Sequence, residues 1–211
     1  MMKDQVVNKL VAGRLVVIIR VTDPAEIPAI VECLVDGGAQ AIEITSNTPG
    51  WQTAVQQLRD DYPQLLIGAG TITSPALAEQ AIAAGAQFLV TPNTRPAVVS
   101  CAHQHGVPVI MGAMTPSEVV EAMEANADII KLFPAGALGP AYLKTLAHGP
   151  YLDTVFFAVG GVDEHNLEQW IDSGAAGVGI GGSLAAPVPT PADANILRER
   201  IRKIVQTLKS K

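Results

Sequence analysis

Aromatic and charged residues are both scarce in this chain of 211 residues, at 4% and 16%. No apolar stretch approaches the roughly 20 residues that a membrane helix needs. The first residues, Met1–Gln5, do not lead into a signal-peptide pattern of basic start, apolar core and cleavage site. We therefore expect a protein that does not bind or cross a membrane.

Basic residues and cysteines are also few. The formal net charge is −6 and basic residues cluster only over 198–203, which argues against a nucleic-acid-binding surface. The two cysteines, Cys33 and Cys101, lack metal-ligand spacing, so we interpret them as reduced core thiols. None of the four histidines ends a predicted strand, and no metal site is expected. These features predict a cytoplasmic protein.

Hydrophobic residues, by contrast, make up 48% of the chain and follow a repeating pattern. Short, continuous apolar runs alternate eight times with alanine-rich stretches of helical character. Apolar runs without polar alternation are typical of parallel strands that are covered on both faces. We predict strands at 15–20, 41–45, 65–70, 88–92, 108–112, 129–134, 155–160 and 177–181.

Signals for helix starts and ends recur between these runs. Thr22–Pro24, Thr73–Pro75 and Thr115–Glu118 each place a capping side chain before a proline that fits the first helical turn. Turns containing glycine or asparagine precede several strands at nearly regular intervals. The repeated unit predicts one domain over residues 1–211, a single (β/α)8 TIM barrel of the α/β class. A doubly wound open sheet is the structural alternative.

Lys131 interrupts the apolar run 129–134, where an ammonium group carries a desolvation cost. Burial favours the neutral amine, which is the form that attacks a carbonyl to make a Schiff base. On the isolated segment, a lysine that reaches the rim or pairs with a carboxylate fits equally well. Because Lys131 and Phe133 share one face of the strand, a barrel would point both into its mouth.

Glu43 is a second charge within an apolar strand, at 41–45. It is either a structural carboxylate that neutralises Lys131 or a general acid/base. The two roles are compatible, since Schiff-base chemistry needs several proton transfers. Arg20 ends the first strand at the same end of the barrel, where it would bind a substrate carboxylate or orient Glu43.

Glycine pairs follow the seventh and eighth strands. In (β/α)8 barrels these loops commonly present backbone N–H groups to a phosphate, and a neighbouring hydroxyl at Ser183 can add a donor. We therefore predict a phosphate site at Gly160, Gly161, Gly181 and Gly182. Turns after three other strands complete the mouth, with further candidate substrate contacts at Asn47, Thr71 and Pro92.

Together these segments resemble the KDPG/KHG aldolases, small class I aldolases that act on 2-keto-3-deoxy sugar acids. The resemblance covers nearly the whole chain and depends on the segments 42–45, 68–71, 130–135, 160–162 and 181–183. It implies that Lys131 forms a Schiff base with pyruvate and that Glu43 shuttles protons. It also implies that Thr71 contacts the pyruvate carboxylate, that Phe133 packs beside the imine, and that the glycine turns with Ser183 hold phosphate. The family is trimeric, so a homotrimer is expected.

Two positions depart from the family pattern. Asn47 stands where many members carry an arginine that helps to bind the substrate carboxylate, so that task must fall elsewhere, with Arg20 as the candidate. Val159 stands where gluconate-type members often have a threonine, which can hydrogen-bond the C4 hydroxyl of the substrate. The segment 158–161 resembles the 6-phosphogalactonate branch instead, although an enzyme that accepts both epimers is an open alternative.

The sequence predicts a lyase that cleaves 2-keto-3-deoxy-6-phosphogluconate, its galactonate epimer, or both, to pyruvate and glyceraldehyde 3-phosphate. The expected partner is this small-molecule substrate, with no metal ion or organic cofactor. Activity on 4-hydroxy-2-oxoglutarate is an alternative. A phosphate-binding isomerase is a rival, although it would usually carry paired acid/base groups or metal ligands. A sugar-phosphate sensor that uses the pocket for binding alone is a third interpretation.

Overall fold

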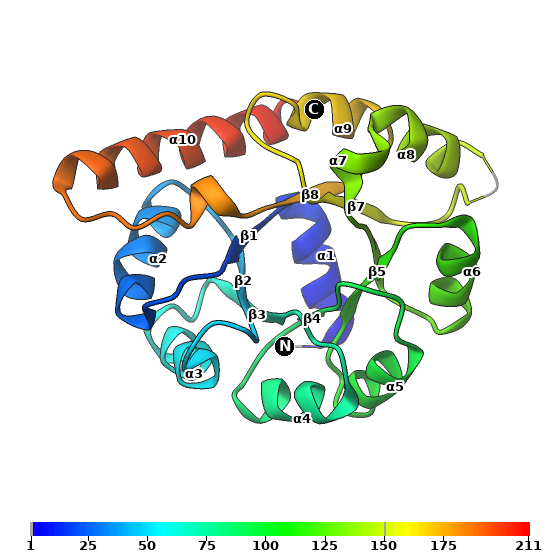
Figure 1. Cartoon of the computed structure of the whole chain (residues 1–211), viewed down its shortest axis with the longest axis horizontal. Coiled ribbons are helices and arrows are strands. Elements are labelled where there is room, and N and C mark those ends of the chain that lie inside the picture. Colours follow the sequence, from blue (N-terminus) through cyan, green and yellow to red (C-terminus); the bar gives the residue numbers. More distant parts are fainter. Residues whose placement is uncertain (1, 150) are drawn as a thin grey trace.

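The chain folds as a closed barrel of eight parallel strands (Figure 1). The structure is a computed structural model, and it describes residues 2–149 and 151–211. Each strand pairs with the next along the chain, and the last pairs with the first, so the open doubly wound alternative is wrong. The strands are β1 (Leu15–Ile19), β2 (Ala41–Thr45), β3 (Leu66–Gly70), β4 (Leu89–Val90), β5 (Val109–Ala113), β6 (Ile129–Leu132), β7 (Phe156–Val159) and β8 (Gly177–Ile180).

Helices form a ring around the barrel and connect consecutive strands (Figure 1). The predicted caps are present: the hydroxyls of Ser74 and Thr115 accept hydrogen bonds from the first turns of α4 and α6, each of which begins with a proline. The connecting elements are η1 (Pro24–Glu26), α2 (Ile27–Asp36), α3 (Trp51–Asp61), α4 (Pro75–Ala83), α5 (Pro96–Gln104), α6 (Pro116–Glu124), α7 (Ala135–Leu138), α8 (Pro140–Ala147) and α9 (Leu167–Asp172), followed after β8 by η2 (Gly182–Leu184) and α10 (Pro191–Lys209).

Alternate residues of each strand belong to two different apolar clusters. On β6, Ile130 and Leu132 pack outward beneath the helices, while Ile129 packs inward with residues of the other strands. This follows from the two-residue period of a strand, which sends successive side chains to opposite faces. The inward face of β6 therefore carries Lys131 into the barrel.

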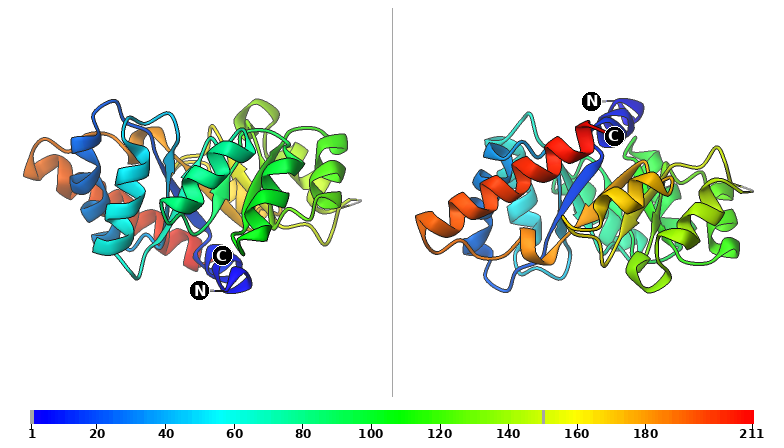
Figure 2. Two further views of the ribbon diagram at one scale, coloured as in Figure 1. Left: turned by 90° about the horizontal axis from the view of Figure 1, so that it is seen from below. Right: turned by 90° about the horizontal axis from the view of Figure 1, so that it is seen from above.

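A helix that the sequence analysis did not identify, α1 (Lys3–Gly13), closes the amino-terminal end of the barrel (Figure 2). Its Val6 and Leu10 are only 3% and 1% exposed and pack against inward-facing strand residues. They are the only fully buried side chains of this helix, and the half-buried Val7 and Val11 pack beside them. With one end plugged, the opposite end is left for a substrate.

Several strands are shorter than predicted at their carboxyl ends. β1 stops before Arg20, β7 stops before Gly160, and β4 stops two residues before the end of the predicted run 88–92. The predicted strands were too long because apolar or β-branched residues stand next to these positions in the sequence. In the structure the chain turns at these positions and forms the mouth of the barrel. Arg20, Pro92 and Gly160 thus belong to loops rather than to the sheet.

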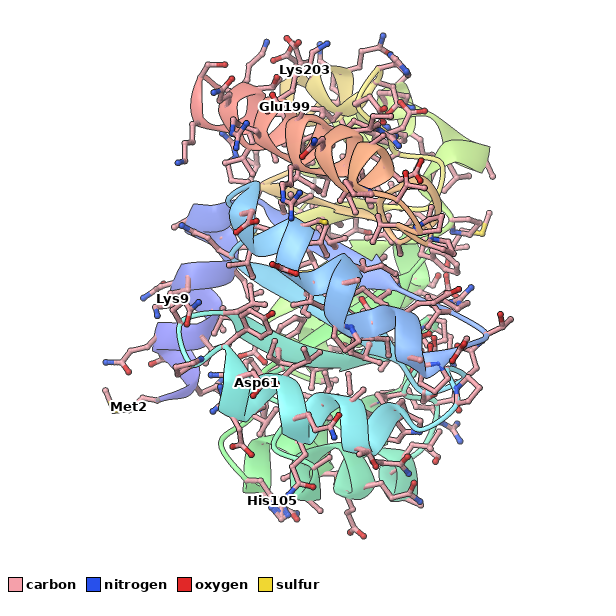
Figure 3. The ribbon with its side chains drawn as sticks, turned by 90° about the vertical axis from the view of Figure 1, so that its left-hand side faces the viewer. Met2, Lys9, Asp61, His105, Glu199 and Lys203 are labelled. Carbon is pink, nitrogen blue, oxygen red and sulfur yellow. The ribbon has the colours of Figure 1, made fainter. Side chains whose placement is uncertain are left out.

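Charged side chains project outward from the helices. Lys9, Asp61 and Lys203 are exposed on the side of the molecule seen in Figure 3. Among the described residues, no helix combines the length and the apolar character that a membrane span requires.

Candidate active site

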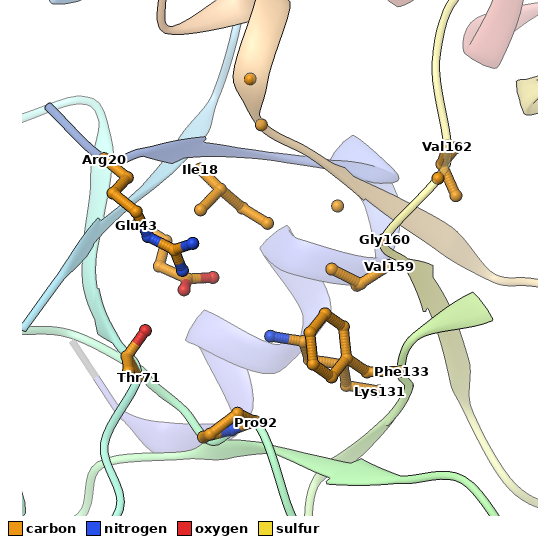
Figure 4. Close-up of a pocket in the computed structure, with 14 residues that line it drawn as sticks. Ile18, Arg20, Glu43, Thr71, Pro92, Lys131, Phe133, Val159, Gly160 and Val162 are labelled. Atoms are coloured by element: carbon orange, nitrogen blue, oxygen red, sulfur yellow. The ribbon is translucent and has the colours of Figure 1, made fainter. Parts of the chain in front are cut away.

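A cavity of about 430 Å³ opens at the carboxyl ends of the strands (Figure 4). Its wall brings together predicted residues from seven of the eight strands and the loops that follow them. These are Arg20, Glu43, Thr71, Pro92, Lys131, Phe133, Val159, Gly160, Gly161, Gly181 and Gly182. The predicted hydroxyl donor of Ser183 lies outside the part of the chain whose side chains are described.

Lys131 lies inside the barrel and is 5% exposed. Its strand holds it between Gly112 of β5 and Phe157 of β7, which are its register partners on either side. The Nζ atom lies 4.7 Å from the centroid of the Phe133 ring, two residues along on the same face. The amine is therefore covered by an aromatic ring and directed into the cavity (Figure 4).

Burial changes the protonation of both charged groups in the cavity. It lowers the pKa of Lys131, an effect that Glu43 opposes and Arg20 reinforces. It raises the pKa of Glu43, which is 2% exposed, against the opposing effects of Lys131 and Arg20. Each group is thereby moved towards its neutral form, and for the lysine that is the nucleophilic form.

Glu43 and Lys131 approach the cavity from different sides (Figure 4). Among the described residues, no ion pair at salt-bridge distance joins Glu43 to Lys131 or to Arg20. A purely structural carboxylate would be expected in direct contact with the amine that it neutralises. The separation instead leaves room for a small ligand between the amine and the carboxylate.

Thr71 adopts a strained backbone conformation at the end of β3, with φ of +59°. A β-branched residue in the left-handed region costs about 1–3 kcal/mol and is held only when its surroundings enforce it. Here the Ser46 hydroxyl donates to the Thr71 carbonyl at 2.9 Å, and the N–H of Ile72 donates to the Val90 carbonyl at 3.1 Å. The loop is thus tied to β2 and β4, and the Thr71 side chain lines the cavity.

The two glycine turns lie at the carboxyl ends of β7 and β8. Gly160 and Gly161 have φ of +86° and +79°, a conformation that other residues adopt only with strain. A Cβ atom on Gly161 would also lie 2.9 Å from the Cα of Gly136, so no side chain fits between the turn and α7. This close packing keeps the cavity wall free of side chains where an anion could approach backbone N–H groups.

One predicted contact is not brought into the site. Asn47 is exposed in the turn after β2 and does not line the cavity. Arg20, which does, is the only arginine among the residues described in the cavity wall. Of these two positions, only Arg20 places a side chain in the cavity wall, and that side chain is a cation.

Comparison with known proteins agrees with this arrangement. Residues 6–198 match the model of the KDPG and KHG aldolase family. The chain belongs to this family. It is 40% identical over 171 residues to the 2-dehydro-3-deoxy-6-phosphogalactonate aldolase of Escherichia coli K12, a match that covers 81% of this chain and 83% of that protein.

Solved structures of other members of the aldolase family have the same fold. The native KDPGal structure superposes with a TM-score of 0.85 at 36% identity and covers 93% of this chain and 94% of its own. A KDPG aldolase from Legionella pneumophila, with pyruvate captured as a covalent carbinolamine intermediate, has a TM-score of 0.80 at 26% identity. The match covers 96% of this chain and 97% of that chain. The family resemblance found in the sequence is confirmed.

Three residues of the aldolase cavity were missed: Ile18, Val162 and Gly179. Strand periodicity could have identified two of them, since Ile18 lies two residues before Arg20 and Gly179 lies two residues before Gly181. Val162 follows the glycine turn, where no periodic pattern applies. Within residues 2–149 and 151–211, no group of three or more His, Cys, Asp or Glu side chains could hold a metal ion.

Proposed function

We propose that this chain is a class I aldolase that cleaves a 2-keto-3-deoxy-6-phospho sugar acid to pyruvate and glyceraldehyde 3-phosphate. The observation that carries the proposal is the buried Lys131, which faces Glu43 across a cavity lined by two glycine turns. Membership of the KDPG and KHG aldolase family supports the same conclusion. A phosphate-binding isomerase would usually carry paired acid/base groups or metal ligands, whereas the described cavity wall offers one lysine and one glutamate.

The reaction begins with the neutral amine of Lys131. Its lone pair attacks the C2 ketone to give a carbinolamine, and loss of water leaves an iminium ion. Glu43, as carboxylate, takes the proton of the C4 hydroxyl, directly or through water, while the C3–C4 bond breaks. The electron pair of that bond forms the C2=C3 double bond while the C=N π pair moves to nitrogen, giving an enamine and releasing glyceraldehyde 3-phosphate. Protonation at C3 and hydrolysis then free pyruvate and the lysine.

The other cavity residues bind and orient the substrate. In this proposal Arg20 and the Thr71 hydroxyl, both in the cavity wall, hold the carboxylate of the keto acid. The glycine turns after β7 and β8 accept the phosphate through backbone N–H groups. Phe133, whose ring covers the Lys131 nitrogen, shields the imine from bulk water.

The galactonate epimer is the preferred substrate in this proposal. Val159, 5% exposed, lines the cavity and offers no hydrogen bond to a C4 hydroxyl. The relative with 40% identity is named for the phosphogalactonate substrate, which supports this preference. The family also includes KHG aldolases, so 4-hydroxy-2-oxoglutarate is the second substrate to assay.

The deciding experiment is reductive trapping. Incubation with pyruvate and borohydride should reduce the imine and leave a covalent adduct on Lys131, detected by peptide mass spectrometry. Lys131→Met should carry no adduct and no aldolase activity. Ligand binding without an adduct on the wild-type protein, unaffected by Lys131→Met, would establish a sugar-phosphate sensor instead.

The family resemblance also leads us to propose a homotrimer that works in the cytoplasm. Met114, Val120 and Met123, on or near α6, are 37%, 39% and 42% exposed, which supports an interface over that helix. Sedimentation equilibrium at micromolar concentration tests the trimer, and a monomer mass would contradict it.

A further inference from the structure

The β4 strand ends after two residues, and the sheet next to it is completed by threonine side chains. The N–H groups of Leu89 and Thr91 donate to the carbonyls of Pro108 and Ile110 at 3.0 and 3.1 Å, as in a regular parallel ladder. The next ladder bond would run from the N–H of Gly112 to the Thr91 carbonyl. Instead, the Gly112 N–H donates to the Thr91 hydroxyl at 2.9 Å.

The next hydrogen bond of the ladder is also replaced by one from a threonine side chain. The Gly112 carbonyl accepts a hydrogen bond from the Thr94 hydroxyl at 2.9 Å. The Thr91 hydroxyl, 0% exposed, also donates to the Asn93 carbonyl at 2.7 Å. Both backbone groups of Gly112 are therefore satisfied by the loop after β4, although that loop has left the sheet.

This arrangement presses Pro92 against the inner face of β5. A Cβ atom on Gly112 would lie 2.5 Å from the carbonyl carbon of Pro92 and 2.6 Å from the Asn93 nitrogen. On this side the turn is held to β5 by the hydroxyl of Thr91. In return, the turn places Pro92 in the wall of the cavity.

Gly112 is also the immediate neighbour of the reactive lysine. It is the register partner of Lys131, and one residue further the Ala113 carbonyl accepts the N–H of Phe133 at 3.1 Å. The strand end that the threonines hold thus supports both the amine and the ring that covers it.

We infer that Thr91 is a positioning residue for the Schiff-base step. Its hydroxyl holds the end of β5 and Pro92 in fixed positions on one side of Lys131, and so sets the approach of the keto acid to the amine. Thr94 contributes the companion bond. The inference rests on the proposed aldolase function, and it assigns neither threonine a contact with substrate.

The test compares side chains of nearly equal shape. Thr91→Val removes the hydroxyl, whereas Thr91→Ser keeps it. Thr48→Val is the matched control. Thr48 is 1% exposed, lies in the turn after β2, and shares a hydrogen bond of 3.2 Å between its hydroxyl and that of Thr45. Thr94→Val removes the companion bond at a half-buried site, which gives a second and milder variant. Each protein is assayed for thermal unfolding, for kcat and KM, and for the rate of reductive trapping with saturating pyruvate.

Misplacement of a reacting group by about 1 Å costs up to roughly a hundredfold in rate. We expect Thr91→Val to lower kcat and the trapping rate together by about ten- to a hundredfold, with little change in KM. Thr94→Val should lower both rates by a smaller factor. Thr91→Ser should have most of the wild-type rate, and Thr48→Val should have all of it.

The inference is overturned if the trapping rate of the valine variants at positions 91 and 94 matches that of the wild type. It is equally overturned if the loss follows thermal stability alone, so that Thr48→Val loses as much. The proposed function fails by a different result, namely no pyruvate adduct on Lys131 of the wild-type protein.

Discussion

The carboxylate of Glu43 occupies the space where any residue other than glycine at position 70 would place its side chain. A Cβ atom built on Gly70 would lie 1.6 Å from Oε1 of Glu43 and 2.3 Å from its carboxyl carbon. Both residues face the barrel interior, and β2 and β3 are paired in register along their whole length. The absence of a side chain on one strand therefore decides where the Glu43 carboxylate on the next strand can lie.

This contact predicts the effect of Gly70→Ala. The methyl group would force the Glu43 carboxylate out of its place, so kcat should fall by about a hundredfold or more, within the range that general acid/base catalysis contributes. Reductive trapping of pyruvate on Lys131 should persist, because position 70 is on β3, whereas the strands that flank Lys131 are β5 and β7. The double variant Gly70→Ala/Glu43→Gln should be no slower than Glu43→Gln alone. Additive losses would mean that Gly70 acts in some other way.

The charges around Lys131 predict opposite pH shifts in two variants. Arg20 lowers the pKa of Lys131, so Arg20→Gln should raise it and move the pH profile of imine trapping to higher pH. Glu43 raises that pKa, so Glu43→Gln should lower it and move the profile to lower pH. The measurement is the trapping rate against pH for the three proteins. A shift of both variants in the same direction would contradict the charge arrangement in the cavity.

Val159→Thr should change the preference between the two epimers. The Val159 side chain packs closely against Gly179, since a Cβ atom built on Gly179 would lie 2.8 Å from Val159 Cγ2. Threonine has nearly the shape of valine, so it should fit the same space. The added hydroxyl can bond the C4 hydroxyl of the gluconate substrate, a gain of about 1 kcal/mol or roughly five- to tenfold in kcat/KM. The ratio of kcat/KM for the two phosphorylated epimers measures this effect. An unchanged ratio would show that residue 159 does not determine the preference between the epimers.

Asp128 predicts a loss of stability at the opposite end of the barrel. Its carboxylate, 6% exposed, pairs with Lys3 of α1 and accepts hydrogen bonds from His103 and from the Val109 N–H, each at 2.8 Å. Asp128→Ala should lower the free energy of unfolding by about 2–4 kcal/mol. Because the site lies at the other end, kcat at a permissive temperature should be unchanged.

The exposed Asp61 of α3 supplies the control for this experiment. Asp61→Ala should alter the free energy of unfolding by less than about 0.5 kcal/mol. Denaturant unfolding of the three proteins provides the comparison. Equal stability of all of them would show that the contacts of Asp128 do not anchor α1.

The sequence alone determined the repeating architecture of this protein. Continuous apolar runs and hydroxyl caps before prolines are local signals, and the predicted strands agree with the observed ones within a few residues. Two charges inside such runs, Glu43 and Lys131, could be selected for the same reason, because burying a charge is costly and needs a cause. Closure of the sheet then brought both to one cavity.

Only the tertiary structure decided the features that depend on contacts between distant segments. The apolar side chains of α1 recur at helical spacing, but only the closed barrel shows that they cover its amino-terminal end. The early end of β4 at Val90 and the exposure of Asn47 depend on how each loop packs, and no periodicity encodes that. Local preferences specify elements, whereas the close approach of Glu43 to Gly70, or the hydrogen bond between Thr91 and Gly112, exists only once neighbouring strands are in register.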